Sequence, residues 1–324
     1  MIQNNTFFRS NKKFQDAIKI LDEGLTYADP QIGLSRYFSK NKIKTTKSTI
    51  NLKEFENVYL VAIGKAADSM AKFVASQIVL KSGIVVLPSD YKPIFTTKKI
   101  RFFRSGHPLP NLQSLRAGKY IQKFVDSTTK NDFIIFLISG GGSSLVTIPY
   151  GITLEEKICV NHELIHCGAK INEISCVRKH ISDIKGGKLI QRMQSSGISF
   201  ILSDVISDDL SSISSGITYA DKTTFSDALK IIKKYKIEKK ISRNVISTLK
   251  SGINGKIPET PKKPKLTNII IGNNKRSLDK MVKKAENLGY SVHVMSGLNS
   301  NVKLTARNIA KKLKVTKKSC IVFG

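Results

Sequence analysis

The sequence lacks long apolar stretches: no run in its 324 residues approaches the roughly 20 needed to cross a bilayer. Its first residues, MIQNNTFFRSNKKF, contain neither an apolar signal core nor a small-residue cleavage site. The four cysteines form no C-x-x-C pair, which argues against a disulfide framework. These absences predict a cytoplasmic protein with reduced thiols and no membrane partner.

Acidic residues are also scarce, with 24 against 54 basic residues and a net charge of +30. Such a charge suggests nucleic-acid binding. However, the excess is spread along the whole chain, and only ten of the basic residues are arginine, the residue favoured for base and phosphate recognition. No aromatic platform is interleaved with the basic residues. We therefore expect no specific nucleic-acid site, only weak polyanion binding that salt removes.

Apolar runs alternate with helical periodicity along most of the chain. The predicted strands are residues 58–63, 84–87, 100–103, 133–138 and 198–202, and the predicted helices are residues 14–25, 66–79, 113–125, 154–171 and 176–193. The continuous run at 133–138 is typical of a strand covered on both faces. This alternation predicts an α/β fold with a Rossmann-like, mainly parallel sheet and flanking helices.

A proline-rich segment suggests a domain boundary. Pro258, Pro261 and Pro264 lie among Gly, Lys and Thr residues, which is a linker composition. We predict an N-terminal α/β domain at 1–255, a linker at 256–265, and an incomplete second α/β domain at 266–324. The predicted elements of that second domain are strands at 268–272, 291–295 and 320–323 and helices at 274–288 and 302–313.

The glycine-rich segment Ser139–Ser144, SGGGSS, directly follows the run at 133–138. Consecutive backbone N–H groups in such a loop can form a nest for phosphate, and the serine hydroxyls add donors. Neither the P-loop spacing nor G-x-G-x-x-G is present. The alternative is a tight turn in which glycine only relieves the strain of a positive φ.

Charged residues follow two other predicted strands. Lys65, in Gly-Lys-Ala-Ala, could neutralise charge on a transferred phosphoryl group, or could be a solvated lysine. Asp204, Asp208 and Asp209 follow the strand at 198–202. Carboxylates suit Mg²⁺ or can accept a proton from a substrate hydroxyl. The alternative is a helix N-cap with acids near the positive end of the helix dipole.

The segment His162–His166, HELIH, matches the zinc-hydrolase pattern H-E-x-x-H. Catalytic zinc needs a third protein ligand, and no downstream residue has the spacing known for such enzymes. We therefore predict a plain helix there rather than a metal site.

Taken in order, several short motifs resemble the glycerate 2-kinase family, whose C-terminal half is called the MOFRL domain. The motifs are GKAA at 64–67, HPLP at 107–110, SGGGSSL at 139–145, VRKHIS at 177–182, KGG at 185–187, SDV at 203–205 and SG at 215–216. The resemblance implies ATP- and Mg²⁺-dependent phosphorylation of D-glycerate to 2-phosphoglycerate, in a cleft between two α/β domains.

The resemblance also implies roles for particular residues. Lys65 is the implied catalytic lysine, and Asp204 is the first choice for the catalytic acid, with Asp208 second. The loop residues Ser139, Gly140, Gly141, Gly142, Ser143 and Ser144 are the implied phosphate and nucleotide site. His107, Arg178 and Lys185 are implied substrate contacts, and Asp208 and Asp209 are candidate Mg²⁺ ligands.

The chain departs from the family pattern at Ile217, where the family has Pro, and at Ser175, where it has Asn. Family members also continue beyond its last strand with G-G-E-[TS] and G-G-R-N-x-E segments, the second carrying an arginine proposed to act in catalysis. We therefore expect low activity from this chain alone, and a homodimer or a separate C-terminal fragment as partner. The competing functions are a non-catalytic nucleotide- or anion-binding protein, and a hydroxypyruvate reductase, against which the missing dinucleotide fingerprint argues.

Overall fold

The protein is described here by a computed structural model, covering residues 11–298, 301–313 and 319–323. Its contacts divide the chain into two units: Tyr37–Ile270, and Met1–Arg36 together with Ile271–Gly324. The predicted domains follow a different division, since they placed the first 36 residues with the large unit and began the second domain at 266. Those domain boundaries remain a prediction. No described helix combines the length and apolarity required to span a membrane.

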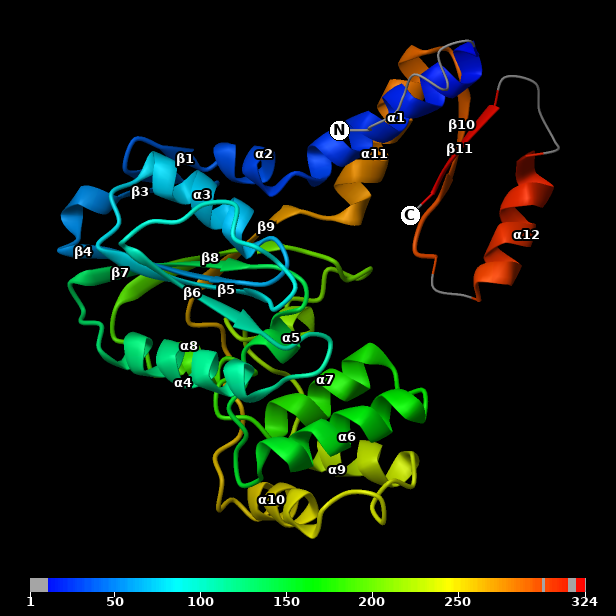
Figure 1. Cartoon of the computed structure of the whole chain (residues 1–324). Helices are drawn as coiled ribbons and strands as arrows, with labels where there is room; N and C mark the ends of the chain where they lie inside the picture. The colour runs from blue at the N-terminus through cyan, green and yellow to red at the C-terminus, as the bar shows by residue number, and fades with distance from the viewer. Residues whose placement is uncertain (1–10, 299–300, 314–318, 324) are drawn as a thin grey trace. The chain divides into compact units, whose positions relative to one another are not determined.

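A six-stranded sheet forms the centre of the large unit (Figure 1). Its strands are β4 (Asn57–Ile63), β5 (Ser82–Pro88), β6 (Ile100–Ser105), β7 (Asp132–Ile138), β8 (Ser196–Leu202) and β9 (Thr267–Gly272), in the order β6-β5-β4-β7-β8-β9. The pairs β4–β5, β4–β7, β5–β6 and β7–β8 are parallel. This is the strand order of a doubly wound fold, which confirms the predicted fold class. β9, predicted to begin the second domain, instead extends this sheet.

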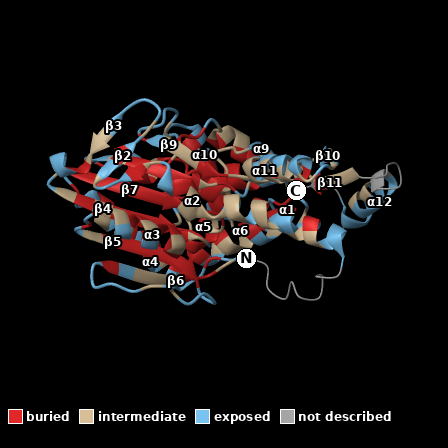
Figure 2. Ribbon diagram, turned by 90° about the horizontal axis from the view of Figure 1, so that it is seen from above, coloured by how far each residue is buried: buried red, intermediate tan, exposed pale blue. Residues whose placement is uncertain are grey.

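Burial explains why the apolar runs form these strands. Every residue of β7 is buried, and Figure 2 shows the strands of the central sheet mostly in the buried class. A run buried on both faces needs helices above and below it. Helices α3 (Ala67–Gln77) and α4 (Leu112–Asp126) lie on opposite faces of the sheet in Figure 1.

A second apolar core lies among helices at one end of the large unit. These helices are α6 (Leu154–His166), α7 (Ile171–His180), α9 (Phe225–Lys234) and α10 (Arg243–Ile253). The unit also contains two short helices, α5 (Gly142–Leu145) and α8 (Lys188–Gln191), and two 3-10 turns, η2 (Leu52–Glu54) and η3 (Ile213–Ser215). A small antiparallel sheet is formed by β1 (Phe38–Ser39), β2 (Lys42–Lys44) and β3 (Thr49–Asn51).

Two predicted helices were wrong in extent, and glycine explains the end of the first. The helix predicted at 154–171 ends at His166, because Gly168 adopts a φ of +74°. The helix predicted at 176–193 begins earlier, at Ile171, and ends at His180; Gly186 and Gly187 follow with φ values of +61° and +83°. A left-handed residue interrupts the hydrogen bonding of a right-handed helix.

The other unit contains α1 (Lys12–Ala28), α2 (Pro30–Ser35), α11 (Asn274–Asn287), β10 (Ser291–Met295), α12 (Val302–Leu313) and β11 (Ser319–Phe323). β10 and β11 pair in parallel. Its core includes Ile20, Leu278, Ala285 and Val322. Gly24 allows α1 to approach α11 closely, since a Cβ there would lie 2.6 Å from the Cγ of Met281.

Candidate active site at the carboxyl ends of β4 and β7

The glycine loop and Lys65 lie at the point where the strand order of the sheet reverses. Ile63 at the end of β4 is in register with Ile138 at the end of β7, so both loops start at the same edge. The amide of Lys65 donates to the carbonyl of Gly140 at 2.9 Å, and the amide of Ala66 donates to the Ser139 hydroxyl at 3.1 Å. In doubly wound sheets, ligands bind in the crevice at this reversal.

The backbone of the glycine loop offers unused donors. Within the described part of the chain, no hydrogen bond is donated by the amides of Gly140, Gly141, Gly142 and Ser143. The following amides of Ser144 and Leu145 bond to the carbonyl of Gly141, which has a φ of +89°. Successive free amides in a turn form a concave site for an anion. The geometry favours the anion loop over the plain turn.

Three charged or titratable side chains surround this loop. A Cβ added at Gly140 would lie 1.9 Å from Oδ2 of Asp204. One added at Gly141 would lie 3.1 Å from the ring of His107 and 3.5 Å from Cγ of Lys65. Absence of a side chain at these two glycines therefore lets Asp204, His107 and Lys65 approach the same loop.

The electrostatics of this cluster favour a neutral histidine. Burial lowers the pKa of His107, and the charge of Lys65 lowers it further, against the opposing effects of Asp90 and Asp204. A neutral imidazole offers one donor and one acceptor. Lys65 and Asp204 are both exposed, so they are accessible to a ligand at the loop.

Lys185 contacts the loop from behind. Its Nζ donates to the carbonyl of Gly142 at 2.8 Å and to that of Ser214 at 3.2 Å, and the residue is 1% exposed. The Ser143 and Ser215 hydroxyls also lie 2.8 Å apart, which ties the glycine loop to the segment around η3. Lys185 therefore touches the loop without facing solvent.

Arg178 lies outside this loop cluster, on α7. Its Nε donates to Oδ1 of Asn161 at 2.8 Å. Burial lowers the pKa of Arg178, and the charge of Arg178 contributes to lowering the pKa of Lys185. Arg178 is thus within electrostatic reach of the loop through Lys185, while no contact joins it to Lys65 or Asp204 among the described residues.

The two predicted Mg²⁺ ligands, Asp208 and Asp209, differ in their local surroundings. Asp208 adopts a φ of +52°. Asp209 accepts hydrogen bonds from the hydroxyls of Ser211 at 2.9 Å and Ser212 at 2.6 Å. Burial alone would raise the pKa of Asp209, but these hydrogen bonds outweigh it and the pKa falls. Asp209 is therefore engaged within its own turn, and the N-cap of the following 3-10 turn is Ser212.

The residues present fit Mg²⁺ through Asp204 rather than through Asp209. No group of three or more His, Cys, Asp or Glu side chains suited to a metal occurs among the residues the structure describes. Mg²⁺ usually keeps several waters and uses one or two carboxylates together with substrate phosphates. The exposed carboxylate of Asp204 beside free loop amides suits that ligand set.

Comparison with known proteins identifies the family. The family model described as a domain of unknown function, DUF4147, matches residues 16–250. The chain belongs to the DUF4147 family. It is 35% identical over 285 residues to a glycerate 2-kinase of Pyrococcus horikoshii, and 34% identical over 306 residues to a D-glycerate 2-kinase of Thermotoga maritima. A relative from Agrobacterium vitis, 42% identical over 183 residues, has hydroxypyruvate reductase in its name.

These alignments cover 86% and 89% of this DUF4147 chain, but 64% and 69% of the Pyrococcus and Thermotoga relatives. The Agrobacterium alignment covers 55% of this chain and 41% of the relative. A crystal structure of glycerate kinase from Thermotoga maritima matches with a TM-score of 0.79 at 30% identity, covering 96% of this chain and 73% of that one. The predicted resemblance to glycerate 2-kinases is confirmed.

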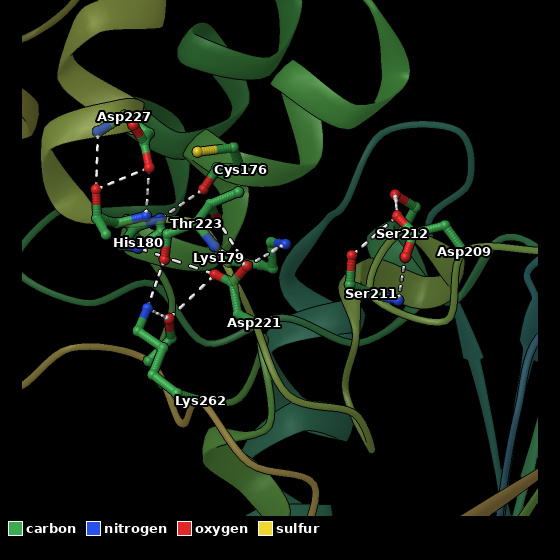
Figure 3. Close-up of polar contacts among 12 residues, drawn as sticks. Cys176, Lys179, His180, Asp209, Ser211, Ser212, Asp221, Thr223, Asp227 and Lys262 are labelled. Carbon is green, nitrogen blue, oxygen red and sulfur yellow. Dashed lines mark hydrogen bonds and ion pairs between the residues drawn. The ribbon is translucent and has the colours of Figure 1, made fainter.

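The DUF4147 chain also contains a buried polar network that the sequence did not reveal (Figure 3). Lys179 Nζ lies 2.6 Å from Oδ1 of Asp221, and both side chains are at most 2% exposed. Thr223 and Thr260 donate to the same carboxylate. Its sequence signal is faint, because Asp221 is one polar residue in a loop and only the fold shows that it is enclosed.

The HELIH segment of this DUF4147 member lies on α6. The rings of His162 and His166 stack with centroids 5.9 Å apart, and both residues are exposed. Glu163 lies 3.4 Å from Nδ1 of His162. The interpretation as a plain helix without metal stays a prediction.

Proposed function

We propose that this chain takes part in ATP- and Mg²⁺-dependent phosphorylation of D-glycerate to 2-phosphoglycerate. The single observation that carries the proposal is the set of four free amides at Gly140–Ser143, with Lys65, His107 and Asp204 around them. The names of the relatives from Pyrococcus and Thermotoga support the reaction class.

The proposed roles follow from the chemistry of each group. The loop amides bind phosphate oxygens, and the Lys65 ammonium offsets negative charge that develops during transfer. The carboxylate of Asp204 accepts the proton of the glycerate hydroxyl, whose oxygen forms the new bond to phosphorus as the bond to ADP breaks. Bound Mg²⁺ would neutralise phosphate charge; if Asp204 holds the ion, Asp208 accepts the proton in its place. Arg178 and His107 are proposed carboxylate contacts.

An ADP-release assay with D-glycerate, ATP and Mg²⁺ tests the reaction, and ³¹P NMR of the product distinguishes 2- from 3-phosphoglycerate. The variants Lys65→Met and Asp204→Asn should lower kcat by at least 100-fold, a typical loss for charge stabilisation or proton transfer. Matched controls are Lys72→Met and Glu238→Gln, which change exposed residues away from the loop. Equal activity in Lys65→Met and Lys72→Met would contradict the proposed role of Lys65.

A second candidate is anion binding without turnover, which the free loop amides favour by themselves. It predicts that millimolar ATP raises the melting temperature while no ADP forms with D-glycerate.

The name of the Agrobacterium relative suggests a reductase instead. Consumption of NADH or NADPH with hydroxypyruvate would support that function over both.

A further inference from the structure

Lys185 is enclosed by backbone. The residue is 1% exposed, and its Nζ donates to the carbonyls of Gly142 and Ser214 at 2.8 and 3.2 Å. An ammonium in this position reaches a ligand only by giving up both carbonyls. The resemblance implies that Lys185 contacts the substrate, whereas in the structure it contacts two backbone carbonyls.

The two carbonyls belong to segments with unusual backbone. Gly142 follows Gly141, which has a φ of +89°, while Ser214 and Ser215 have φ values of +50° and +56°. A non-glycine residue in the left-handed region is strained, and persists only where its surroundings hold it. The Ser214 hydroxyl also donates to the Ser139 carbonyl at 3.0 Å, so the two segments fix each other.

The charge of Lys185 has no acidic counterpart. No ion pair to Lys185 occurs among the described residues, and its partners are the two carbonyl dipoles. Burial lowers the pKa of Lys185 well below its ordinary value, with Lys157 and Arg178 adding to the effect. A buried amine without a carboxylate is costly, so a requirement for its position explains why an apolar residue does not stand there.

We propose that Lys185 is a positioning residue that clamps the carbonyls of Gly142 and Ser214 and thereby holds the glycine loop in its anion-binding shape. The inference rests on the proposed phosphate-binding role of that loop. Without the clamp, the loop amides lose their common direction and Ser214 loses part of what holds its backbone.

Hydrogen exchange of the full chain tests the clamp without any ligand. The amides of Leu145, Val146 and Gly216 are hydrogen-bonded in the two clamped segments. In Lys185→Met, which keeps the side-chain length but removes the donor, their exchange should be at least tenfold faster. The matched control is Lys188→Met, because Lys188 is half-buried and donates to the carbonyls of Ser182 and Lys179 instead. Unchanged exchange in Lys185→Met, or equal acceleration in Lys188→Met, overturns the proposal.

Binding and turnover separate a clamp from a substrate contact. In Lys185→Met, the affinity for tripolyphosphate at 0.15 M salt should fall at least tenfold, and kcat should fall by a similar factor while KM for D-glycerate changes less than twofold. A rise in KM alone would assign Lys185 to the substrate and reject the clamp. Lys185→Arg, which retains donors, should restore at least part of the tripolyphosphate affinity.

The outcomes distinguish this inference from the proposed function. If the wild-type chain binds no tripolyphosphate, the phosphate role of the loop fails, and the exchange experiment still decides whether Lys185 clamps it. If Lys185→Met does not fold, Lys185→Gln, whose shorter side chain cannot reach both carbonyls, takes its place in that experiment. Tenfold faster exchange of the Leu145, Val146 and Gly216 amides in folded Lys185→Gln then supports the clamp, and unchanged exchange there rejects it.

Discussion

Lys157 shows how a single buried residue can make the stability of the chain depend on pH. It lies on α6, is 2% exposed, and donates to the carbonyl of Ile181 at 3.4 Å. Burial, together with the charges of Arg178 and Lys188, lowers the pKa of Lys157 from 10.5 to about 7. Between these two values the unfolded chain binds the proton and the folded chain does not. The free energy of unfolding therefore rises with pH in that window.

Replacing Lys157 by Met should remove this dependence. Relative to Lys157→Met, the wild-type chain should gain roughly 2 to 3 kcal/mol of stability between pH 6 and pH 9, since each pKa unit corresponds to about 1.4 kcal/mol. Urea unfolding at the two pH values measures the difference. Lys250→Met, at an exposed position on α10, should follow the wild-type curve. Parallel pH curves for wild type and Lys157→Met would show that Lys157 keeps its ordinary pKa.

Ser175 is the residue at which the chain departs from the asparagine of the family. A serine hydroxyl reaches less far than a carboxamide, and Oγ of Ser175 is buried with no hydrogen-bond partner among the described residues. A buried unsatisfied polar group costs about 1–3 kcal/mol, and alanine favours helix. Ser175→Ala should therefore stabilise the chain by about 1 kcal/mol in urea unfolding.

Ser114 supplies the matched comparison. It is also a buried helical serine, but its hydroxyl accepts from the amides of Gly106 and Asn111 at 3.2 and 3.1 Å. Ser114→Ala should destabilise the chain by about 1–2 kcal/mol, because it leaves the Asn111 amide without an acceptor and the Gly106 amide with only Oδ1 of Asn111. Changes of the same sign in both variants would mean that hydrogen-bond satisfaction does not decide the effect.

At the scale of the element, glycine at position 141 does two things: it adopts a left-handed backbone, and it leaves room for the side chains around the loop. Two glycine-to-alanine variants separate these effects. Gly141→Ala places a Cβ on a backbone with φ of +89° and within 3.1 Å of His107. Gly255→Ala meets a φ of +74° but no atom within 4 Å. Both should cost about 1 kcal/mol of stability from the left-handed backbone. Only Gly141→Ala should lower tripolyphosphate affinity, by at least tenfold; an equal loss in Gly255→Ala would exclude a local effect.

Helices and strands were predictable from the sequence where the pattern of apolar residues was strong. They were less predictable where a glycine with a positive φ interrupts a helix. The apolar run at 133–138 identified β7, because a strand buried on both faces needs no alternation. The end of α6 was misjudged because nothing local distinguishes Gly168, with a φ of +74°, from a helical glycine. The glycine loop was recognisable as a possible anion site, but its free amides depend on the left-handed Gly141, which only the fold shows.

At the scale of the whole molecule, strand order decides what meets at the site. Lys65 and Gly140 are distant in sequence, and β4 and β7 bring them together only because these strands are neighbours in register. Asp204 joins them because β8 lies beside β7. Motif order in the resemblance suggested this grouping, but spacing along the chain could not show it. The enclosed pair of Lys179 and Asp221 was missed for the same reason.

The net charge of +30 predicts non-specific binding of polyanions by the whole chain. A test of the glycine loop must therefore separate such binding from binding at the loop. Binding to duplex DNA should be independent of sequence and should weaken by at least tenfold between 0.05 and 0.3 M salt, because it depends on counterion release. Stabilisation by ATP at the glycine loop should persist at 0.3 M salt, since enclosed amides are screened less than surface lysines. Gly141→Ala should abolish the stabilisation and leave DNA retention unchanged. Fluorescence anisotropy measures DNA binding and thermal melting measures the stabilisation by ATP. Unchanged ATP stabilisation in Gly141→Ala would mean that ATP is held by diffuse charge rather than by the glycine loop, and loss of both effects would mean that DNA binds at the loop as well.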